Sequence, residues 1–245
     1  MHYFEGDETI GRSLELYGEY CYHEIEWILS LTNHNSFVLD IGAYIGTHSI
    51  AISPHVSKVL AFEPDKTCFD LLLVNIRSSM LKNISPVPLA ISDILGQVGT
   101  EFNFEKTNVT NSGTIHSTPI DMIADLPKID FVKIDTGGTE LQVLNGMRQV
   151  LATKPNILIN MSNEETVSDT YDLLNGFGYK LYWLLVPTYN GNNHKGNTLN
   201  VFGPKHGTIN WIATSLDLSQ KLIEVESNND TALASVHRAN ERTKL

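Results

Sequence analysis

The sequence predicts an α/β domain built on a seven-stranded, mostly parallel sheet with helices on both faces and a C-terminal antiparallel strand. Short apolar runs without alternation recur along the chain, as strands that are buried on both faces of a parallel sheet require. Segments with helical spacing alternate with these runs, and this alternation favours a parallel sheet. The chain has 245 residues, of which 42% are hydrophobic, enough for one large core. We expect a single domain over residues 1–223 and a polar, mobile tail over residues 224–245.

The first part of the chain predicts three strands and three helices. It opens with a helical lead-in over residues 1–35, in which Ile25, Ile28 and Leu29 share one helical face. The expected strands are residues 37–41, 58–63 and 87–93. The expected helices are residues 20–32, a short helix that opens at Thr47 and ends at Pro54, and residues 65–80.

The second part begins with an insertion over residues 96–119, which is rich in Gly, Thr, Asn and Ser and is expected to form a hairpin over the ligand cleft. The expected strands that follow are residues 129–135, 156–160, 179–186 and 198–202, with the last two antiparallel. The expected helices are a short one that begins in residues 118–123, then residues 140–151 and 164–175.

Composition narrows the possible partners. The formal net charge is −11, and the 17 Lys and Arg residues form no run, which disfavours nucleic acid and anionic membranes as partners. The two cysteines, Cys21 and Cys68, lack the spacing of a disulfide framework or a zinc site and are expected to be buried. No secretory signal and no span of membrane length is visible. We expect a cytoplasmic protein without a metal site, and no pattern specifies its oligomeric state.

The loop Asp40-Ile41-Gly42-Ala43-Tyr44-Ile45-Gly46 joins the first expected strand to the helix that follows, where ligands bind in such sheets. Gly42 permits close approach of a ligand, and Gly46 permits close packing of helix on strand. Tyr44 stands where a dinucleotide fingerprint has its second glycine, which disfavours an NAD-dependent oxidoreductase.

Acidic residues at the ends of the next two expected strands favour a cationic ligand that contains adenosine. Glu63 can accept hydrogen bonds from both ribose hydroxyls, and Asp93 can accept one from the adenine amine. S-adenosylmethionine fits this pattern, although Asp40 and Asp93 could also cap turns. The predicted cofactor-binding residues are Asp40, Gly42, Ala43, Tyr44, Gly46, Glu63, Ser92, Asp93 and Asp135.

Three segments resemble the FkbM family of class I S-adenosylmethionine-dependent methyltransferases. They are residues 37–46, 60–64 and 132–140, and the resemblance extends over about residues 10–205. It implies a Rossmann-like methyltransferase fold and methyl transfer, usually to a hydroxyl of a sugar, glycan or polyketide. The family residues matched here are Asp40, Gly42, Gly46, Glu63, Lys133, Asp135, Gly138 and Glu140.

The chain departs from the family pattern at three positions. The family usually has Asn at the position of Tyr44, and Glu at the positions of Gly137 and Asn160. The last two differences remove carboxylates from the expected rim of the active site. The resemblance makes an O-methyltransferase that acts on a carbohydrate or small molecule the principal hypothesis. The two missing carboxylates motivate the alternative, a binding or scaffold protein that kept the fold and lost turnover.

Asp135 and His48 are the candidate catalytic residues. Asp135 follows the fourth strand and could take the proton of an acceptor hydroxyl, or could only order its loop. His48 could act as a base or simply pack against the loop of residues 40–46, called the cofactor loop below. Lys133 is expected to pair with a carboxylate such as Glu140.

The candidate substrate-binding residues lie at the expected rim of the cleft. They are Glu140, Asn160 and Asn200. Weaker candidates for the walls of the acceptor site are His116, Asp121, His194 and Lys195, which are equally typical of solvated loops.

Overall fold

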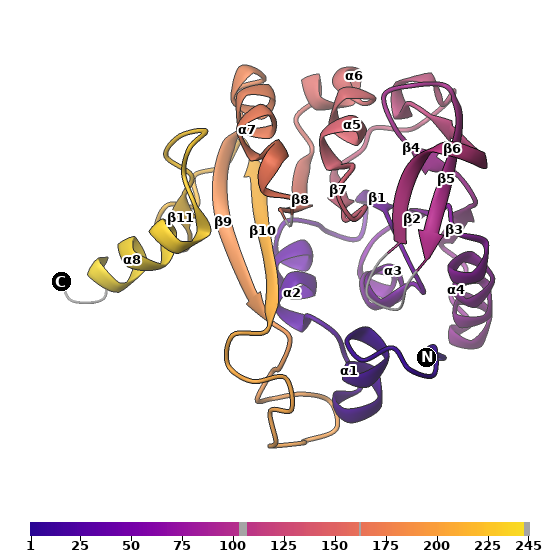
Figure 1. Ribbon diagram of the computed structural model, residues 1–245, viewed down its shortest axis with the longest axis horizontal. Coiled ribbons are helices and arrows are strands. Elements are labelled where there is room, and N and C mark those ends of the chain that lie inside the picture. Colours follow the sequence, from indigo (N-terminus) through magenta and orange to yellow (C-terminus); the bar gives the residue numbers. More distant parts are fainter. Residues whose placement is uncertain (103–106, 162, 243–245) are drawn as a thin grey trace.

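A computed structural model describes residues 1–102, 107–161 and 163–242. In this part of the chain an eight-stranded sheet forms the centre of the molecule (Figure 1). Its strands, in spatial order, are β11 (Ile223–Glu224), β9 (Lys180–Pro187), β10 (Gly207–Thr214), β8 (Asn156–Asn160), β7 (Phe131–Ile134), β1 (Phe37–Ile41), β2 (Lys58–Phe62) and β3 (Ile84–Val87).

The sheet is parallel from β8 to β3 and antiparallel at its other end. β10 runs antiparallel to both β8 and β9, and β11 runs antiparallel to β9. The α/β class with C-terminal antiparallel strands is therefore confirmed. The chain runs outward from β1 to β3 and then returns to β7 beside β1. That reversal is the switch point at which open α/β sheets bind ligands.

Helices cover both faces of the sheet. The α-helices are α1 (Ile10–Tyr17), α2 (Tyr22–Ser30), α3 (Thr47–Ile52), α4 (Lys66–Ser79), α5 (Glu140–Asn145), α6 (Arg148–Ala152), α7 (Val167–Gly176) and α8 (Ala232–Arg242). Short 3₁₀ turns occupy η1 (Ser53–His55), η2 (Ile120–Met122) and η3 (Glu164–Thr166). Gly18 separates α1 from the expected helix of residues 20–32, which corresponds to α2.

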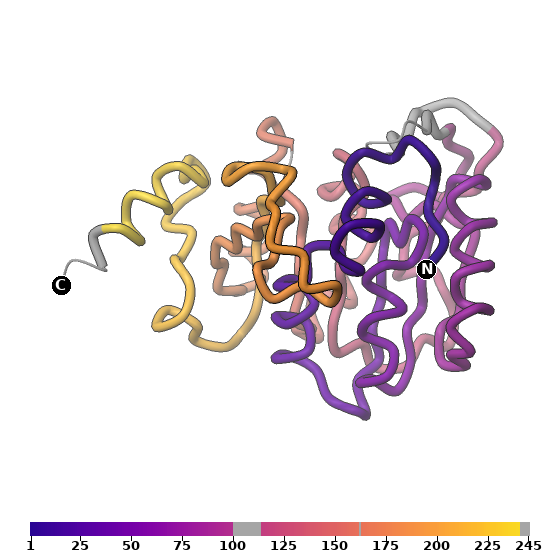
Figure 2. Tube along the Cα trace, turned by 90° about the horizontal axis from the view of Figure 1, so that it is seen from below, coloured from indigo at the N-terminus to yellow at the C-terminus, as the bar shows by residue number. Residues whose placement is uncertain are grey.

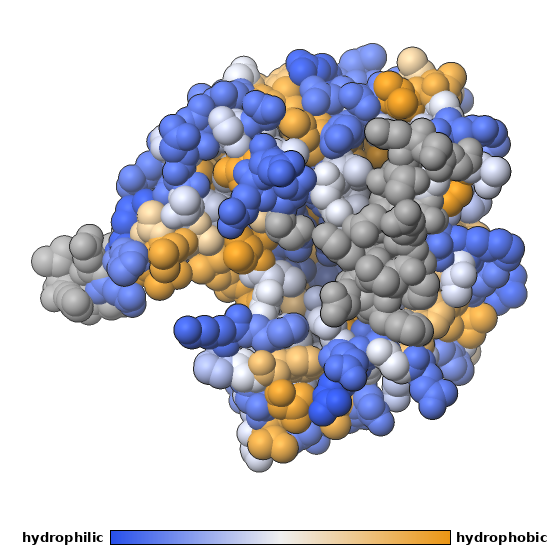
Figure 3. Space-filling view, viewed as in Figure 1, coloured by the Kyte–Doolittle hydropathy of each residue, from blue (hydrophilic) through white to orange (hydrophobic). Residues whose placement is uncertain are grey.

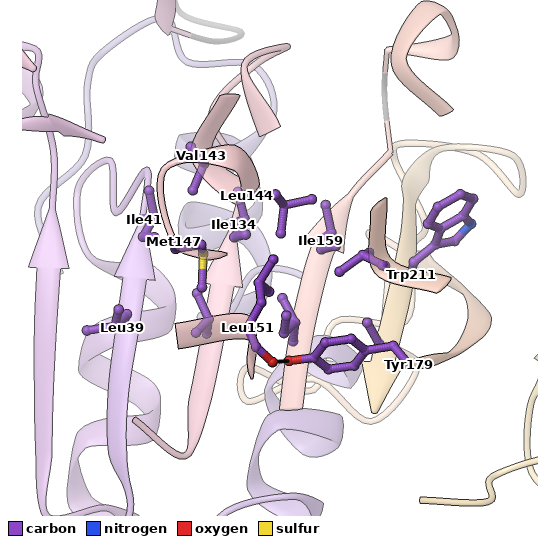
Figure 4. Close-up of a cluster of buried hydrophobic side chains, with 14 of the residues drawn as sticks. Leu39, Ile41, Ile134, Val143, Leu144, Met147, Leu151, Ile159, Tyr179 and Trp211 are labelled. Carbon is purple, nitrogen blue, oxygen red and sulfur yellow. Dashed lines mark hydrogen bonds between the residues drawn. The ribbon is translucent and has the colours of Figure 1, made fainter. Parts of the chain in front are cut away.

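Two hydrophobic cores lie on opposite faces of the sheet. Successive side chains of a strand point to opposite faces, so Leu39 and Val38 enter different cores. Figure 4 shows the core in which strand side chains pack under α5 and α6. The Tyr179 hydroxyl closes the far end of this core by donating to the Leu151 carbonyl at 3.2 Å. The second core packs α2, α3 and α4 against the other face and contains Cys21. Both cysteines are buried, as expected.

The expected strand 87–93 is wrong in its details. Pro88 lacks an N–H donor, and the chain leaves the main sheet there. β4 (Ala90–Ile91) instead joins a three-stranded sheet with β6 (Thr107–Thr118) and β5 (Gly96–Phe102). The insertion is thus a β5–β6 hairpin, as its composition predicted.

The expected strand 198–202 is also wrong, since those residues lie in a loop. The Asn197 side chain accepts from the Leu199 N–H, and the Asn200 side chain accepts from Phe202 and Gly203, so local turns replace a strand. The strand that the sequence reading missed is β10, whose Trp211 and Ile212 are fully buried.

A polar, mobile tail was expected from residue 224, but the described residues 224–242 include part of β11 and all of α8. Glu224 pairs with Tyr182 in the sheet, and α8 follows. Arg238 of α8 forms an ion pair with Asp230, whose carboxylate also accepts from the Trp183 indole N–H at 3.0 Å. Apolar side chains gather on the outer face of α8, where Leu233 and Val236 are exposed (Figure 3). Among the described residues, no helix has the length and apolar character to cross a bilayer.

Candidate functional site

A pocket of about 700 Å³, partly open to solvent, lies at the carboxyl ends of β1, β2 and β7. The predicted residues Gly42, Tyr44, Glu63 and Asp135 line it together. Its other lining residues are Ile10, Ile41, Phe62, Pro64, Leu89, Ala90, Ile91, Thr136, Gly137 and Thr139. The pocket lies at the edge of the sheet where the sequence predicted a ligand site.

The loop after β1 has a backbone that its glycines make possible. Gly42 has φ +82°, and a Cβ there would lie 1.9 Å from the Asp135 carbonyl oxygen, so the β1 and β7 loops meet only because a side chain is absent. Gly46 has φ +90°, and a Cβ there would lie 2.6 Å from Leu72 of α4. The expected close packing of helix against loop is observed.

Tyr44 also adopts the left-handed conformation, with φ +50°. Its backbone N–H donates to Glu63 Oε2 at 2.8 Å, and its hydroxyl donates to Asp7 Oδ2 at 3.2 Å. Asn tolerates this conformation better than Tyr does. The conformation thus explains why a pattern with Asn suits this position, and the contacts of the Tyr44 side chain offset the strain.

Glu63 presents a buried carboxylate to the pocket. Only 2% of the residue is exposed, and its two oxygens accept from the backbone N–H groups of Tyr44 and Asp65 at 2.8 and 2.9 Å. Burial raises the pKa of Glu63 to about 7, although the two backbone donors oppose the rise. Each carboxylate oxygen has a second lone pair, so Glu63 can still accept from a ligand.

Asp40 does not line the pocket. It lies in β1, fully buried, where it pairs with Lys133 at 3.2 Å and accepts from the Ser49 hydroxyl at 2.6 Å. Burial alone would raise the pKa of Asp40, but Lys133 and Ser49 outweigh it and hold the pKa below its ordinary value. Asp40 therefore fixes β1 to β7 and α3 beneath the cofactor loop. Lys133 pairs with a carboxylate as expected, but that carboxylate belongs to Asp40, not to Glu140.

Asp135 follows β7 and turns its carboxylate toward the pocket, with 42% of its side chain exposed. Its nearest cation is Lys133, at 3.8 Å. The protein around Asp135 raises the pKa of its carboxyl group by limiting solvation, and Lys133 opposes this rise. Asp135 is thus a pocket carboxylate with a higher proton affinity than an ordinary aspartate.

The loop after Asp135 is ordered by Glu140. Glu140 Oε1 accepts from the N–H groups of Thr136 and Gly138, both at 3.0 Å, and from the Thr136 hydroxyl at 3.2 Å. The residue is buried, and its carboxylate faces this loop. The structure does not bring Glu140 to an acceptor, because its carboxylate is occupied in shaping the pocket wall.

His48 lies outside the pocket, with both ring nitrogens facing protein atoms. Its Nε2 contacts Glu24 Oε2 at 2.9 Å, and its Nδ1 lies 3.4 Å from the Thr47 hydroxyl. Glu24 also accepts from the side chains of Thr208 and Asn210. The packing role weighed for His48 fits this arrangement better than the role of a base. The sequence analysis missed Glu24, because its partners Thr208 and Asn210 lie far away in the sequence, in β10.

Other predicted residues lie away from the pocket lining. Asp93 is exposed, and its carboxylate accepts a hydrogen bond from the Ser92 hydroxyl at 3.1 Å. The chain leaves the main sheet at Pro88, so Leu89, Ala90 and Ile91 line the pocket and Asp93 lies beyond it. The residues outside the lining are Asp40, Ala43, Gly46, His48, Ser92, Asp93, Glu140, Asn160 and Asn200, with the weaker candidates His116, Asp121, His194 and Lys195.

Two of these residues have clear local roles. Asn200 forms a turn within its own loop. Asp121 accepts from the N–H groups of Gln149 and Val150, at the first turns of α6. Among the described residues, no group of three or more His, Cys, Asp and Glu side chains is arranged to hold a metal ion.

Comparisons with known proteins identify the family of this chain. A family model described as the methyltransferase FkbM domain matches residues 40–181, more than half of the chain. A curated relative, the hexuronic acid methyltransferase AglP of Haloferax volcanii, is 28% identical over 176 residues. That match covers 68% of this chain and 72% of the relative.

Solved structures with the same fold include an FkbM methyltransferase from Methylobacillus flagellatus, with a TM-score of 0.51 and 20% identity. The match covers 74% of this chain but only 44% of that longer one. The precorrin-6y C5,15-methyltransferase of Geobacter metallireducens has a TM-score of 0.53 and 16% identity, over 78% of this chain and 87% of that one. A precorrin 8w decarboxylase from Methanobacterium thermoautotrophicum has a TM-score of 0.55 and 15% identity, over 79% of this chain and 90% of that one. At these identities the likeness extends to the fold alone.

Proposed function

Because the chain belongs to the FkbM methyltransferase family, we propose that it transfers a methyl group from S-adenosylmethionine to a hydroxyl of a sugar, a glycan or another small molecule. The observation that carries this proposal is the pocket at the switch point of the sheet. Among the residues that the structure describes, its lining contains two acidic residues, Glu63 and Asp135, and no lysine or arginine. A pocket of this charge favours a cationic ligand and disfavours one with phosphate groups.

The lining residues fit S-adenosylmethionine in their chemistry. Glu63 would accept from the ribose hydroxyls, while Leu89, Ala90 and Ile91 offer an apolar surface to the adenine ring. The cofactor, when bound, supplies an activated methyl group on a sulfonium.

Asp135 is the residue proposed to act on the acceptor. Asp135 lines the pocket, and its carboxylate would take the proton that the acceptor hydroxyl gives up. A raised pKa makes it a better base than an ordinary aspartate. Glu140 orders the loop beside it, and a fixed loop holds the reactants at the distance and angle that methyl transfer needs.

The proposed acceptor class rests on the curated relative. That relative is named a hexuronic acid methyltransferase, and it matches 68% of this chain. A carbohydrate acceptor is therefore the first class to test, with other hydroxyl compounds as the comparison.

The experiment has two parts. Calorimetry with the purified chain should detect S-adenosylmethionine and S-adenosylhomocysteine and should detect no NAD. A transfer assay with a labelled methyl group should then give product on a panel of sugars and uronic-acid-containing oligosaccharides. Absence of cofactor binding would refute the proposal. Binding without product on any acceptor would instead support the alternative of a scaffold protein that has lost turnover.

A further inference from the structure

We propose that the N-terminal segment, Met1–Tyr17, forms a wall of the cofactor pocket, with Ile10 touching the cofactor and Asp7 positioning Ile10 against the cofactor loop. This inference rests on the proposed function, because it assumes that the pocket holds S-adenosylmethionine. The segment lies outside the residues that match the family model, which begin at Asp40. The wall is therefore a feature of this chain and is not implied by the family match.

Ile10 provides the direct observation. It is the first residue of α1, it is half-buried, and it lines the same pocket as Gly42, Tyr44 and Glu63. An isoleucine at this place gives the pocket an apolar surface on the side opposite the sheet. A ligand that fills the pocket would cover the exposed part of Ile10, and burial of that surface favours binding.

Asp7 connects this residue to the cofactor loop. Its carboxylate is 4% exposed, and Oδ1 accepts from the N–H groups of Thr9 and Ile10 at 3.1 and 2.9 Å, at the start of α1. Its other oxygen, Oδ2, accepts from the Tyr44 hydroxyl at 3.2 Å. One buried carboxylate therefore holds the beginning of α1 and the tip of the cofactor loop at a fixed separation.

Two more contacts attach the segment to the same part of the molecule. The His2 N–H donates to Asn75 Oδ1 at 2.6 Å, and Asn75 Nδ2 donates to the carbonyls of His2 and Ile45, both at 2.9 Å. The rings of Phe4 and Tyr44 lie 6.0 Å apart. Figures 1 and 2 both place the N-terminus beside α4, consistent with these contacts. The segment is thus fastened on both sides of Ile10, since the Tyr17 hydroxyl also donates to the Leu199 carbonyl at 2.9 Å.

The first test uses the unaltered full chain. Hydrogen exchange is measured with and without saturating S-adenosylhomocysteine. The amides of Thr9 and Ile10, which donate to Asp7, should exchange about tenfold more slowly when the cofactor product is bound, because binding stabilises the closed segment. Unchanged exchange in residues 2–14, with protection in the Gly42–Gly46 loop, would overturn the inference and leave the proposed function intact.

The second test uses variants that change one contact each. Ile10→Ala should weaken the affinity for S-adenosylhomocysteine about tenfold, the scale expected for the loss of two or three buried methyl or methylene groups. Asp7→Asn and Tyr44→Phe should each weaken it about threefold to tenfold and should not add in the double variant, because they remove the same contact. Glu8→Ala, an exposed neighbour in the same segment, is the matched control and should bind like the unaltered chain.

The comparison with Glu63→Ala separates the two proposals. If Glu63→Ala loses affinity while Ile10→Ala and Asp7→Asn retain it, the N-terminal wall is refuted and the cofactor site stands. If the unaltered chain binds no cofactor, the proposed function fails and the wall fails with it. Tyr44→Phe removes one oxygen atom only, so it tests the contact even if a larger change prevents folding.

Discussion

At the scale of single residues, Glu63 carries two opposing demands. The carboxylate must be charged to accept from ribose hydroxyls, yet burial raises its pKa to about 7 from a reference value of 4.5. A group whose pKa is raised on folding stabilises the folded protein below the unfolded pKa, and this contribution is lost as the pH rises through the folded pKa. As the pH rises from about 4.5 to about 7, ionisation of Glu63 therefore lowers the stability of the cofactor-free protein, and the stability stays lower above pH 7.

Cofactor binding should show the opposite dependence on pH. Because the ribose hydroxyls donate to the charged form of Glu63, the affinity for S-adenosylhomocysteine should rise about tenfold between pH 6 and pH 8. Glu63→Gln should bind more weakly and should lose most of this pH dependence, since its amide does not titrate. Calorimetry at pH 6, 7 and 8 on both proteins measures the effect. The same pH slope in the two proteins would show that another group is responsible.

Asp135 permits a second test at this scale. Asp135→Asn keeps the shape of the side chain but removes its ability to take a proton, so kcat should fall about 10²-fold to 10⁴-fold. The affinity for S-adenosylhomocysteine should change by no more than a few fold, because the cofactor contacts remain. Asp169→Asn, on the exposed face of α7, serves as the control. Full turnover by Asp135→Asn would restrict Asp135 to ordering its loop.

The predicted site residues that line the pocket share one property. Gly42, Tyr44, Glu63 and Asp135 lie immediately after buried parallel strands, so the strand pattern alone brings them to one edge of the sheet. Ile10 and Glu24 could not be found in this way. They reach the site or its surroundings through α1 and α2, whose docking depends on contacts with residues far away in the sequence, such as Tyr44 and Asn210.

At the scale of elements, predictions failed where a segment is positioned by contacts with residues far away in the sequence. The strands with continuous apolar runs were located, because burial on both faces leaves a clear pattern. β10 was missed because Asn210 interrupts its apolar run, and that side chain is satisfied by Glu24 in a distant helix. The expected helix 140–151 was continuous, whereas α5 and α6 are separated at Gly146 and Met147. Glycine has a low helix propensity, so Gly146 is a local signal for this break, and a neighbouring loop leaves no room for a side chain there.

Gly146 shows how that neighbour acts. A Cβ at this position would lie 2.0 Å from the Ser92 carbonyl oxygen, in the loop that follows β4. Gly146→Ala should therefore destabilise the protein by about 1–3 kcal/mol, the usual cost of overpacking, because backbone must move to make room. Urea unfolding with a tryptophan fluorescence readout measures the change.

Gly176 is the matched control for this prediction. It ends α7, and a Cβ there would meet nothing within 4 Å. Gly176→Ala should stabilise the protein by about 0.5–1 kcal/mol, since alanine loses less conformational entropy in a helix than glycine does. Equal effects of the two substitutions would contradict the steric explanation for the break between α5 and α6.

At the scale of the whole molecule, parts outside the family domain complete the fold. α2 precedes residues 40–181 and β10 follows them, yet β10 lies between β8 and β9 in the sheet. Glu24 joins these parts, because it contacts His48 of α3 and the side chains of Thr208 and Asn210 in β10. Segments that are nearly 190 residues apart in sequence, at positions 24 and 210, are therefore connected by one buried carboxylate.

This connection predicts that Glu24 contributes strongly to stability. Burial alone would raise the pKa of Glu24, but its contacts with His48, Thr208 and Lys133 outweigh burial and lower the pKa. A group whose pKa is lowered on folding stabilises the protein above its unfolded pKa, and this contribution is lost as the pH falls through the folded value. The stability due to Glu24 should thus be present at pH 7 and decline in acid below about pH 4.5.

Substitution at Glu24 measures that contribution against a neighbour on the same helix. Glu24→Ala should reduce the free energy of unfolding at pH 7 by about 3–5 kcal/mol, because it leaves buried polar partners unsatisfied in two other elements. Glu26→Ala removes a half-exposed pair with His23 and should change it by less than about 0.5 kcal/mol. The difference between the two variants should begin to shrink when urea unfolding is repeated at pH 4, because Glu24 in the unfolded chain takes up a proton below about pH 4.5. A difference that stays constant with pH would mean that Glu24 acts through packing alone, and the charge that joins α2, α3 and β10 would then be dispensable.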